Sequence, residues 1–183
     1  MRLAWRVRRG LRRAGLVASL ALWVAGCSTL PAPGPGGMST VSGRLAVNVA
    51  ATPQAIAQSL SAAFELSGDA AQGRLKLISP IGTQVALARW APDGAELDTG
   101  DGPRRFPDLA ALSREALGEE VPLAALGDWL AGRAWPGAPA EPQPEGFTQL
   151  GWRIDLAKFA SDALVVAQRA ASPAVTLRAK LDR

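Results

Sequence analysis

The sequence of 183 residues contains no histidine, no tyrosine and only one cysteine, Cys27. Without histidine, neither a Ser-His-Asp nor a Cys-His catalytic arrangement can form. No cluster of the residue types that bind zinc is present either. A single cysteine excludes an internal disulfide. We therefore predict that the protein is not an enzyme, and that it uses no metal and no other cofactor.

Two other signs of catalysis are also weak. The sequence has no glycine-rich loop followed by lysine, the pattern that cradles phosphates in nucleotide-binding proteins. The paired acids Glu119 and Glu120 could in principle serve a hydrolase. They lie in a predicted connection between helices, however, where a solvated charge pair is the simpler interpretation.

The first 26 residues have the parts of a secretory signal peptide. Residues 1–13 contain six arginines and no acid, and residues 14–25 are an uninterrupted run of small and apolar side chains. This run is shorter than the about 20 apolar residues that a membrane-spanning helix needs. It leads into Val-Ala-Gly-Cys at 24–27, which resembles a bacterial lipobox, in which the cysteine is acylated and becomes the new N-terminus. The alternative for Cys27 is an unpaired free thiol.

Removal of the signal peptide changes the net charge. Six of the 20 basic residues lie in it, and the remaining 14 face 16 acids, so the formal charge falls from +4 to about −2. No basic run with interleaved aromatic residues follows. We therefore expect no nucleic-acid partner.

The sequence therefore predicts that the chain has three parts. Residues 1–26 are the cleaved signal peptide, and residues 27–42, rich in Pro, Gly, Ser and Thr, are the acylated cysteine with a flexible tether. Residues 43–183 form one domain. Ser28 after the cysteine favours the outer membrane, by resemblance to the sorting rule of Gram-negative lipoproteins.

The period of apolar residues predicts strands at both ends of the domain and helices between them. Alternation predicts strands over 43–49, 59–67, 74–78, 84–90, 95–99, 151–159, 162–170 and 174–182. A period near 3.6 predicts helices over 107–118 and 122–132. Residues 50–58 are either a loop or a short helical turn, and residues 134–146 are predicted to be a long loop. This order predicts a mainly β fold with α: an antiparallel sheet curled into an open barrel, its mouth covered by the helices.

The segment 74–90 is predicted to be a hairpin whose tip is unusual. Each of its strands has one apolar face that is predicted to be buried, formed by Leu75 and Leu77 in the first strand and by Val85 and Leu87 in the second. The turn Ser-Pro-Ile-Gly at 79–82 has the residues preferred in a type I turn except at its third position, Ile81. Ile81 is either a stray exposed apolar residue, which is common, or a functional tip.

The order of the motifs resembles the LolB family, the outer-membrane lipoprotein receptors of the bacterial lipoprotein localisation pathway. After the lipobox at Cys27 come G-R-L-A-V at 43–47, L-x-L-x-S-P-I-G at 75–82, V-P-L-x-x-L-x-x-W-L-x-G at 121–132 and F-T-Q-x-G-W at 147–152. The resemblance implies an open half-barrel with an apolar cavity. A monomer, anchored through Cys27 on the periplasmic face, would take the acyl chains of cargo lipoproteins from a LolA-type carrier and pass them to outer-membrane lipid.

The same resemblance implies roles for individual residues. Pro80, Ile81 and Gly82 correspond to the family's membrane-insertion loop, where leucine is usual in place of Ile81. Trp129 and Trp152 match tryptophans near the cavity, and ordinary core packing is an equal interpretation for both. Further candidates for the cavity wall are Leu77, Val85 and Leu126.

Two departures from the family pattern and two alternative functions stay open. The segment between Cys27 and the first strand is short, and the chain ends at Arg183 without an aromatic ending, which leaves the last strand pairing undecided. The alternatives are a lipidated barrel that binds a small apolar ligand and a structural envelope lipoprotein without a ligand.

Overall fold

The computed structural model describes residues 40–182. The predictions for the signal peptide and Cys27, and most of those for the tether, lie outside the described residues. The chain divides into units at residues 1–37 and 38–183, and the second is described below. Its first strand, β1, begins at Thr40, so residues 40–42 belong to the sheet and not to the predicted tether.

The described residues form one antiparallel sheet of 11 strands, and its order confirms the predicted open half-barrel. The order is β6-β5-β4-β3-β2-β1-β11-β10-β9-β8-β7, and the edge strands β6 and β7 do not pair with each other. The strands are β1 (Thr40–Val49), β2 (Gln58–Gly68), β3 (Gly73–Ile78), β4 (Gln84–Ala91), β5 (Gly94–Asp98), β6 (Pro103–Phe106), β7 (Ala140–Gln143), β8 (Gly146–Gln149), β9 (Trp152–Asp155), β10 (Leu164–Arg169) and β11 (Val175–Leu181).

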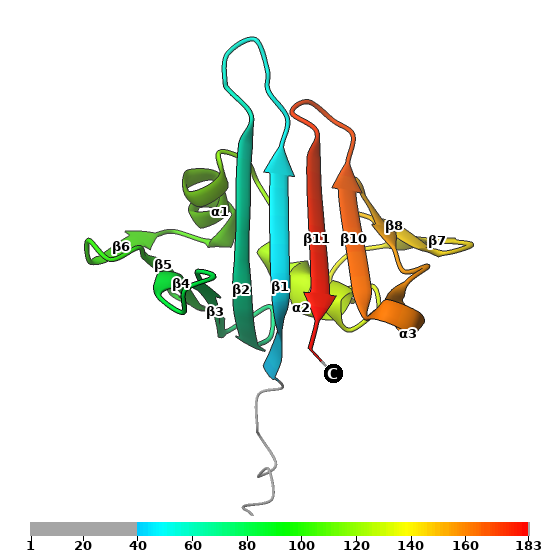
Figure 1. The fold of residues 1–183 in the computed structure, drawn as a ribbon, viewed down its shortest axis with the longest axis horizontal. Coiled ribbons are helices and arrows are strands. Elements are labelled where there is room, and N and C mark those ends of the chain that lie inside the picture. Colours follow the sequence, from blue (N-terminus) through cyan, green and yellow to red (C-terminus); the bar gives the residue numbers. More distant parts are fainter. Residues whose placement is uncertain (1–39, 183) are drawn as a thin grey trace, which may run out of the picture. The chain divides into compact units, whose positions relative to one another are not determined.

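The first and last strands are neighbours at the centre of the sheet (Figure 1). β11 pairs with β1 from Leu181 opposite Gly43 to Val175 opposite Val49. The pairing that the sequence left undecided is therefore complete. Alternation in β1 follows the prediction, with Leu45, Val47 and Val49 buried.

Two predicted helices lie against one face of the sheet (Figure 1). The first, α1 (Leu109–Leu117), is capped by Asp108, whose Oδ1 accepts a hydrogen bond from the Ala111 N–H at 2.7 Å. It ends at Gly118, which has φ 72°, a conformation that glycine adopts without strain. The second, α2 (Leu123–Leu130), buries one side formed by Ala125, Leu126, Trp129 and Leu130.

Several predicted boundaries are wrong. Strands β6 and β7 were not predicted, and β7 lies inside the segment expected to be a loop. It is an edge strand that contains Pro142, and an edge strand tolerates proline because only one side needs donors. The predicted strand 151–159 corresponds to β9 alone, and its last residue begins the short helix α3 (Phe159–Asp162). The strand β8, which precedes β9, was not predicted.

The inward face of β4 also differs from the prediction. From Ala86 on, its inner residues are Ala86, Ala88 and Trp90, whereas Leu87 is opposite the outward-facing Lys76. The reason is a bulge: Leu77 is opposite Ala86 but Ile78 is opposite Gln84, which leaves Val85 as an extra residue. The inserted residue shifts the alternation by one.

Residues 50–57 form a loop, the first of the two alternatives. Thr52 and Ala55 form an isolated bridge, and the Thr52 hydroxyl accepts hydrogen bonds from the N–H groups of Gln54 and Ala55. At the other end of β2, the Asp69 carboxylate closes a turn in the same manner. The Gln72 N–H, and next the Ala71 N–H, lower the pKa of Asp69 by bonding its charged form.

Candidate ligand cavity

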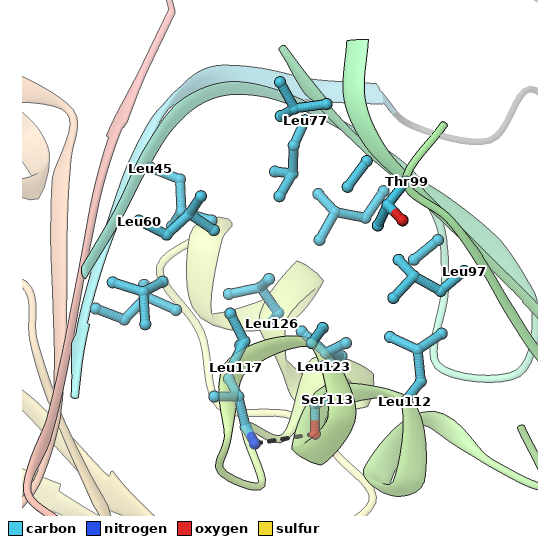
Figure 2. A pocket seen from close by; sticks show the side chains of 18 residues that line it. Leu45, Leu60, Leu77, Leu97, Thr99, Leu112, Ser113, Leu117, Leu123 and Leu126 are labelled. Atoms are coloured by element: carbon cyan, nitrogen blue, oxygen red, sulfur yellow. Dashed lines mark hydrogen bonds between the residues drawn. The ribbon is translucent and has the colours of Figure 1, made fainter. Parts of the chain in front are cut away.

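A cavity of about 260 Å³ lies between the sheet and the helices α1 and α2. Figure 2 shows leucines of the sheet facing leucines of the helices across it. Sixteen of its 18 lining residues are apolar, and the other two are Thr99 and Ser113. No charged side chain lines it, so the cavity can hold an apolar ligand but offers no group for acid–base chemistry.

The sheet wall follows from strand alternation. Leu45, Leu60, Leu75, Leu77 and Leu97 all lie on the inner face of their strands and line the cavity. Side chains two residues apart on a strand point to the same face, so Leu75 and Leu77 contribute together.

The helix wall follows from helical spacing. On α1, Leu112 and Ala116 are four residues apart and face the same way. Ser113 is fully buried there, but its hydroxyl is satisfied both as a hydrogen-bond donor and as an acceptor. Its hydroxyl donates to the Ala110 carbonyl at 3.1 Å and accepts from the Val121 N–H at 3.2 Å, the bond drawn in Figure 2. On α2, Leu123 and Leu126 complete the wall.

The predicted hairpin adjoins this cavity. Leu77 before the turn and Val85 after it both line the wall, and Val85 is also 38% exposed. The turn is closed by the Gly82 N–H, which donates to the Ser79 carbonyl at 2.9 Å, and Gly82 has φ 85°. Ile81 at the tip is 89% exposed, the solvent-facing position that the turn predicted.

Three of the five predicted wall residues lie at the cavity and two do not. Leu77, Val85 and Leu126 line it. Trp129 and Trp152 are instead 1% and 2% exposed and pack on each other, with ring centroids 6.0 Å apart. Of the two interpretations of these tryptophans, the structure supports core packing.

Sequence reasoning missed the residue that organises this core, Gln149. Its side chain is buried and makes four hydrogen bonds: Oε1 accepts from the Trp129 indole and from the Trp135 N–H, and Nε2 donates to the carbonyls of Trp135 and Ala138. Its place within F-T-Q-x-G-W was the available signal, but a glutamine in a strand gives no direct indication of burial.

Arg169, at the end of β10, was also missed, and it corrects the interpretation of Glu119. Its Nη2 is 2.7 Å from the Glu119 carboxylate, and its guanidinium lies 5.7 Å from the centroid of the Trp152 ring. Both members of the ion pair are mostly buried. Glu119 is therefore paired and not solvated, whereas Glu120 is exposed.

Comparison with known proteins identifies the family. The model of the family described as outer membrane lipoprotein LolB matches residues 39–181. The chain belongs to the LolB family. Relatives named outer-membrane lipoprotein LolB include those of Bordetella petrii, 34% identical over 91% of this chain and 87% of the relative, and Cupriavidus metallidurans, 31% identical over 80% and 77%. A third, from Thiobacillus denitrificans, is 32% identical over 84% and 87%.

The match to the LolB family covers all the described strands and helices that build the cavity. Within residues 40–182, no helix is long and apolar enough to cross a membrane. In the same part of the chain, no group of three or more acidic or cysteine side chains is placed to hold a metal ion.

Proposed function

We propose that this LolB-family chain is an outer-membrane receptor that binds the acyl chains of lipoproteins in the leucine-lined cavity. It takes them from a LolA-type periplasmic carrier and releases them into the outer membrane. The main support is the cavity itself, which has 16 apolar lining residues and no charge. Acylation of Cys27 provides the permanent anchor, for which more than one acyl chain is required.

The energetics suit a transfer without ATP. Each methylene removed from water is worth about 0.8 kcal/mol, so an acyl chain needs an enclosed apolar site while it crosses the periplasm. The bilayer offers the same gain over the whole chain length. Transfer from the cavity to the membrane therefore runs downhill once the two are in contact.

The volume bears on how cargo enters. About 260 Å³ is just below the roughly 300–1,000 Å³ of typical ligand pockets. We infer that α1 and α2 move away from the sheet as an acyl chain enters between them. The small volume also favours a second candidate, a lipidated barrel that binds one small apolar ligand.

Mass spectrometry of material that co-purifies with the protein separates these functions. A lipoprotein receptor retains acylated protein, and a small-ligand barrel retains a free apolar molecule. Ala86→Phe, which places a ring in the cavity from the inner face of β4, should reduce retention of acylated protein at least about fivefold. The matched control is Arg89→Phe, which adds the same ring at an exposed position of β4 and should leave retention unchanged. Equal retention in both variants would contradict binding in this cavity.

A further inference from the structure

The exposed large apolar side chains are unevenly distributed. Among residues 40–182 they are Ile56, Ile81, Val85 and Leu150, with exposed fractions of 84%, 89%, 38% and 47%. Ile56 lies between β1 and β2, Ile81 and Val85 lie at or beside the β3–β4 turn, and Leu150 lies between β8 and β9. None of them is on the outer face of a central strand.

These connections leave the sheet at one end. Because every neighbouring pair of strands is antiparallel, the connections β1–β2, β3–β4, β5–β6, β8–β9 and β10–β11 share that end. Figure 1 shows two of them, β1–β2 and β10–β11, side by side beyond the arrowhead of β1. We call this end of the sheet the apolar end.

Charge separates the two ends as well. Four of the five connections at the apolar end, residues 50–57, 79–83, 150–151 and 170–174, contain no charged residue. The acids there are Asp101 in the β5–β6 turn and the Glu119–Glu120 pair after α1. Each connection between two strands at the opposite end carries an acid: Asp69, Asp93, Glu145 and, together with Lys158, Asp162.

Folding does not account for the exposed residues. Leu150 has φ 54° and Gly151 has φ 76°, so the two form a tight hairpin turn whose first position favours asparagine or glycine. A leucine there occupies a strained conformation while about half its surface stays in water. Ile56, at 84% exposed, likewise buries almost nothing. Leu150 therefore carries a conformational cost that burial does not offset, and an outlier of this kind is a starting point for a hypothesis of function.

Three of these connections, β1–β2, β10–β11 and β8–β9, are linked through contacts with the end of α1 and Arg169. Ile56, Gly118, Glu119 and Pro173 line one shallow hollow, which places the β1–β2 loop beside the end of α1 and the β10–β11 connection. Arg169 joins this group to the next turn, because it pairs with Glu119 and lies over Trp152, the residue directly after Gly151.

We propose that the apolar end is a membrane-contact surface, with Ile56 and Leu150 as contact points in addition to the Ile81 tip. This rests on the proposed function, in which the receptor delivers cargo to lipid, and adds where and at how many points it touches the bilayer. A lipid surface fits better than a protein partner because the apolar groups are separate protruding tips. A stable protein interface needs a packed, continuous area of about 800 Å² per partner, whereas a fluid bilayer accepts isolated side chains.

Vesicle partition of the domain alone tests this surface. Every described strand and helix lies within residues 40–182, so a chain that begins at Ser28 keeps the whole domain and lacks the acylated cysteine. Its partition into phosphatidylcholine vesicles is measured by sedimentation, without cargo or carrier. Ile56→Glu and Leu150→Asp should each weaken partition about tenfold, which corresponds to about 1.4 kcal/mol. Aspartate suits position 150 because it tolerates a positive φ.

The matched control is Ala71→Glu, which adds the same charge in an exposed turn at the opposite end. It should leave partition unchanged, and Ile56→Leu should bind like the original chain. Near-ultraviolet circular dichroism checks that each variant is folded, and Ile56→Gln removes the apolar group without adding charge.

Unchanged partition in both Ile56→Glu and Leu150→Asp, or an equal loss in Ala71→Glu, overturns the proposal. So does a loss of cargo uptake from the carrier with partition spared, because the surface would then dock a protein. Normal partition by a chain that takes up no cargo would instead contradict the proposed function alone.

Discussion

The indole N–H of Trp129 donates a hydrogen bond to the side-chain oxygen of Gln149 across 2.8 Å, joining α2 to β8 in the core. The same oxygen accepts the Trp135 N–H at 3.0 Å, and the Gln149 amide nitrogen donates to two carbonyls of the segment after α2. One buried side chain therefore holds the helix layer and the following loop against the sheet.

Replacing Gln149 by leucine should destabilise the protein strongly. The change leaves two buried donors and two acceptors without a partner, at about 1–3 kcal/mol each and not additively. We expect the free energy of unfolding to fall by at least about 3 kcal/mol, measured by urea denaturation. Trp129→Phe, which removes only one of the four bonds, should cost less than half as much. A loss below about 1 kcal/mol for Gln149→Leu would contradict this role.

The pair of Arg169 and Glu119 should contribute to stability more than an ordinary surface ion pair. Their side chains are 17% and 25% exposed, and the Arg169 Nε is buried without a hydrogen-bond partner among the described residues. A hydrogen bond to a charged group is worth about 1.5–3 kcal/mol, so Glu119→Gln should lower the free energy of unfolding by about that amount.

The control for this pair is Glu120→Gln next to it, on an exposed side chain. Surface changes of this kind usually stay within about ±0.5 kcal/mol. Equal effects of the two substitutions in the same denaturation experiment would show that the pair is not specific.

Delivery of cargo should depend on the hairpin tip. Ile81 is exposed in the folded chain, so Ile81→Glu should change stability by less than about 0.5 kcal/mol. A charge entering the bilayer costs up to about 2.5–3.5 kcal/mol at its centre and less near the interface. The variant should accept cargo from the carrier but release it slowly to liposomes, with the two steps measured separately.

Ile81→Leu should deliver cargo like the original chain, because it keeps an apolar side chain of the same size. If Ile81→Glu lost the first step and kept the second, the hairpin would be a surface for docking the carrier.

Periodicity predicted the central strands well because their alternation reflects a single buried face. Leu45, Val47 and Val49 show it directly, since β1 is paired on both sides and has one face against the helices. The prediction failed where a local irregularity decided the outcome. The bulge at Val85 shifted the alternation of β4 by one residue, so that Leu87 faces outward. The period of apolar residues in the sequence does not indicate where such an extra residue is inserted.

The candidate site was predictable only where it depended on apolar residues. Leu77 and Leu126 reach the cavity through ordinary strand and helix spacing. Gln149 and Arg169 are polar residues that meet their partners across 20 and 50 positions of sequence. Contacts of this kind exist only once the fold brings the segments together, so the pattern of a single segment does not reveal them.

Replacement of Cys27 by alanine tests the anchor. The secreted chain should be soluble in the periplasm, and its domain should keep its stability because residue 27 lies outside the described sheet. Uptake of lipoprotein from the carrier should persist, whereas the chain should no longer fractionate with outer membranes. Fractionation with membranes in spite of the substitution would assign the anchor to another part of the protein.

The direction of β1 sets a length requirement on the segment before it. The strand starts at the end of the sheet opposite the apolar end and is 10 residues long, about 33 Å at 3.3 Å per residue. Residues 28–39 can span at most about 40 Å when fully extended. An acyl anchor at Cys27 can therefore let the apolar end reach its own membrane, but with little slack. Deletion of five residues from this segment leaves a reach of about 23 Å. The shortened chain should therefore load cargo normally but release little of it into the membrane.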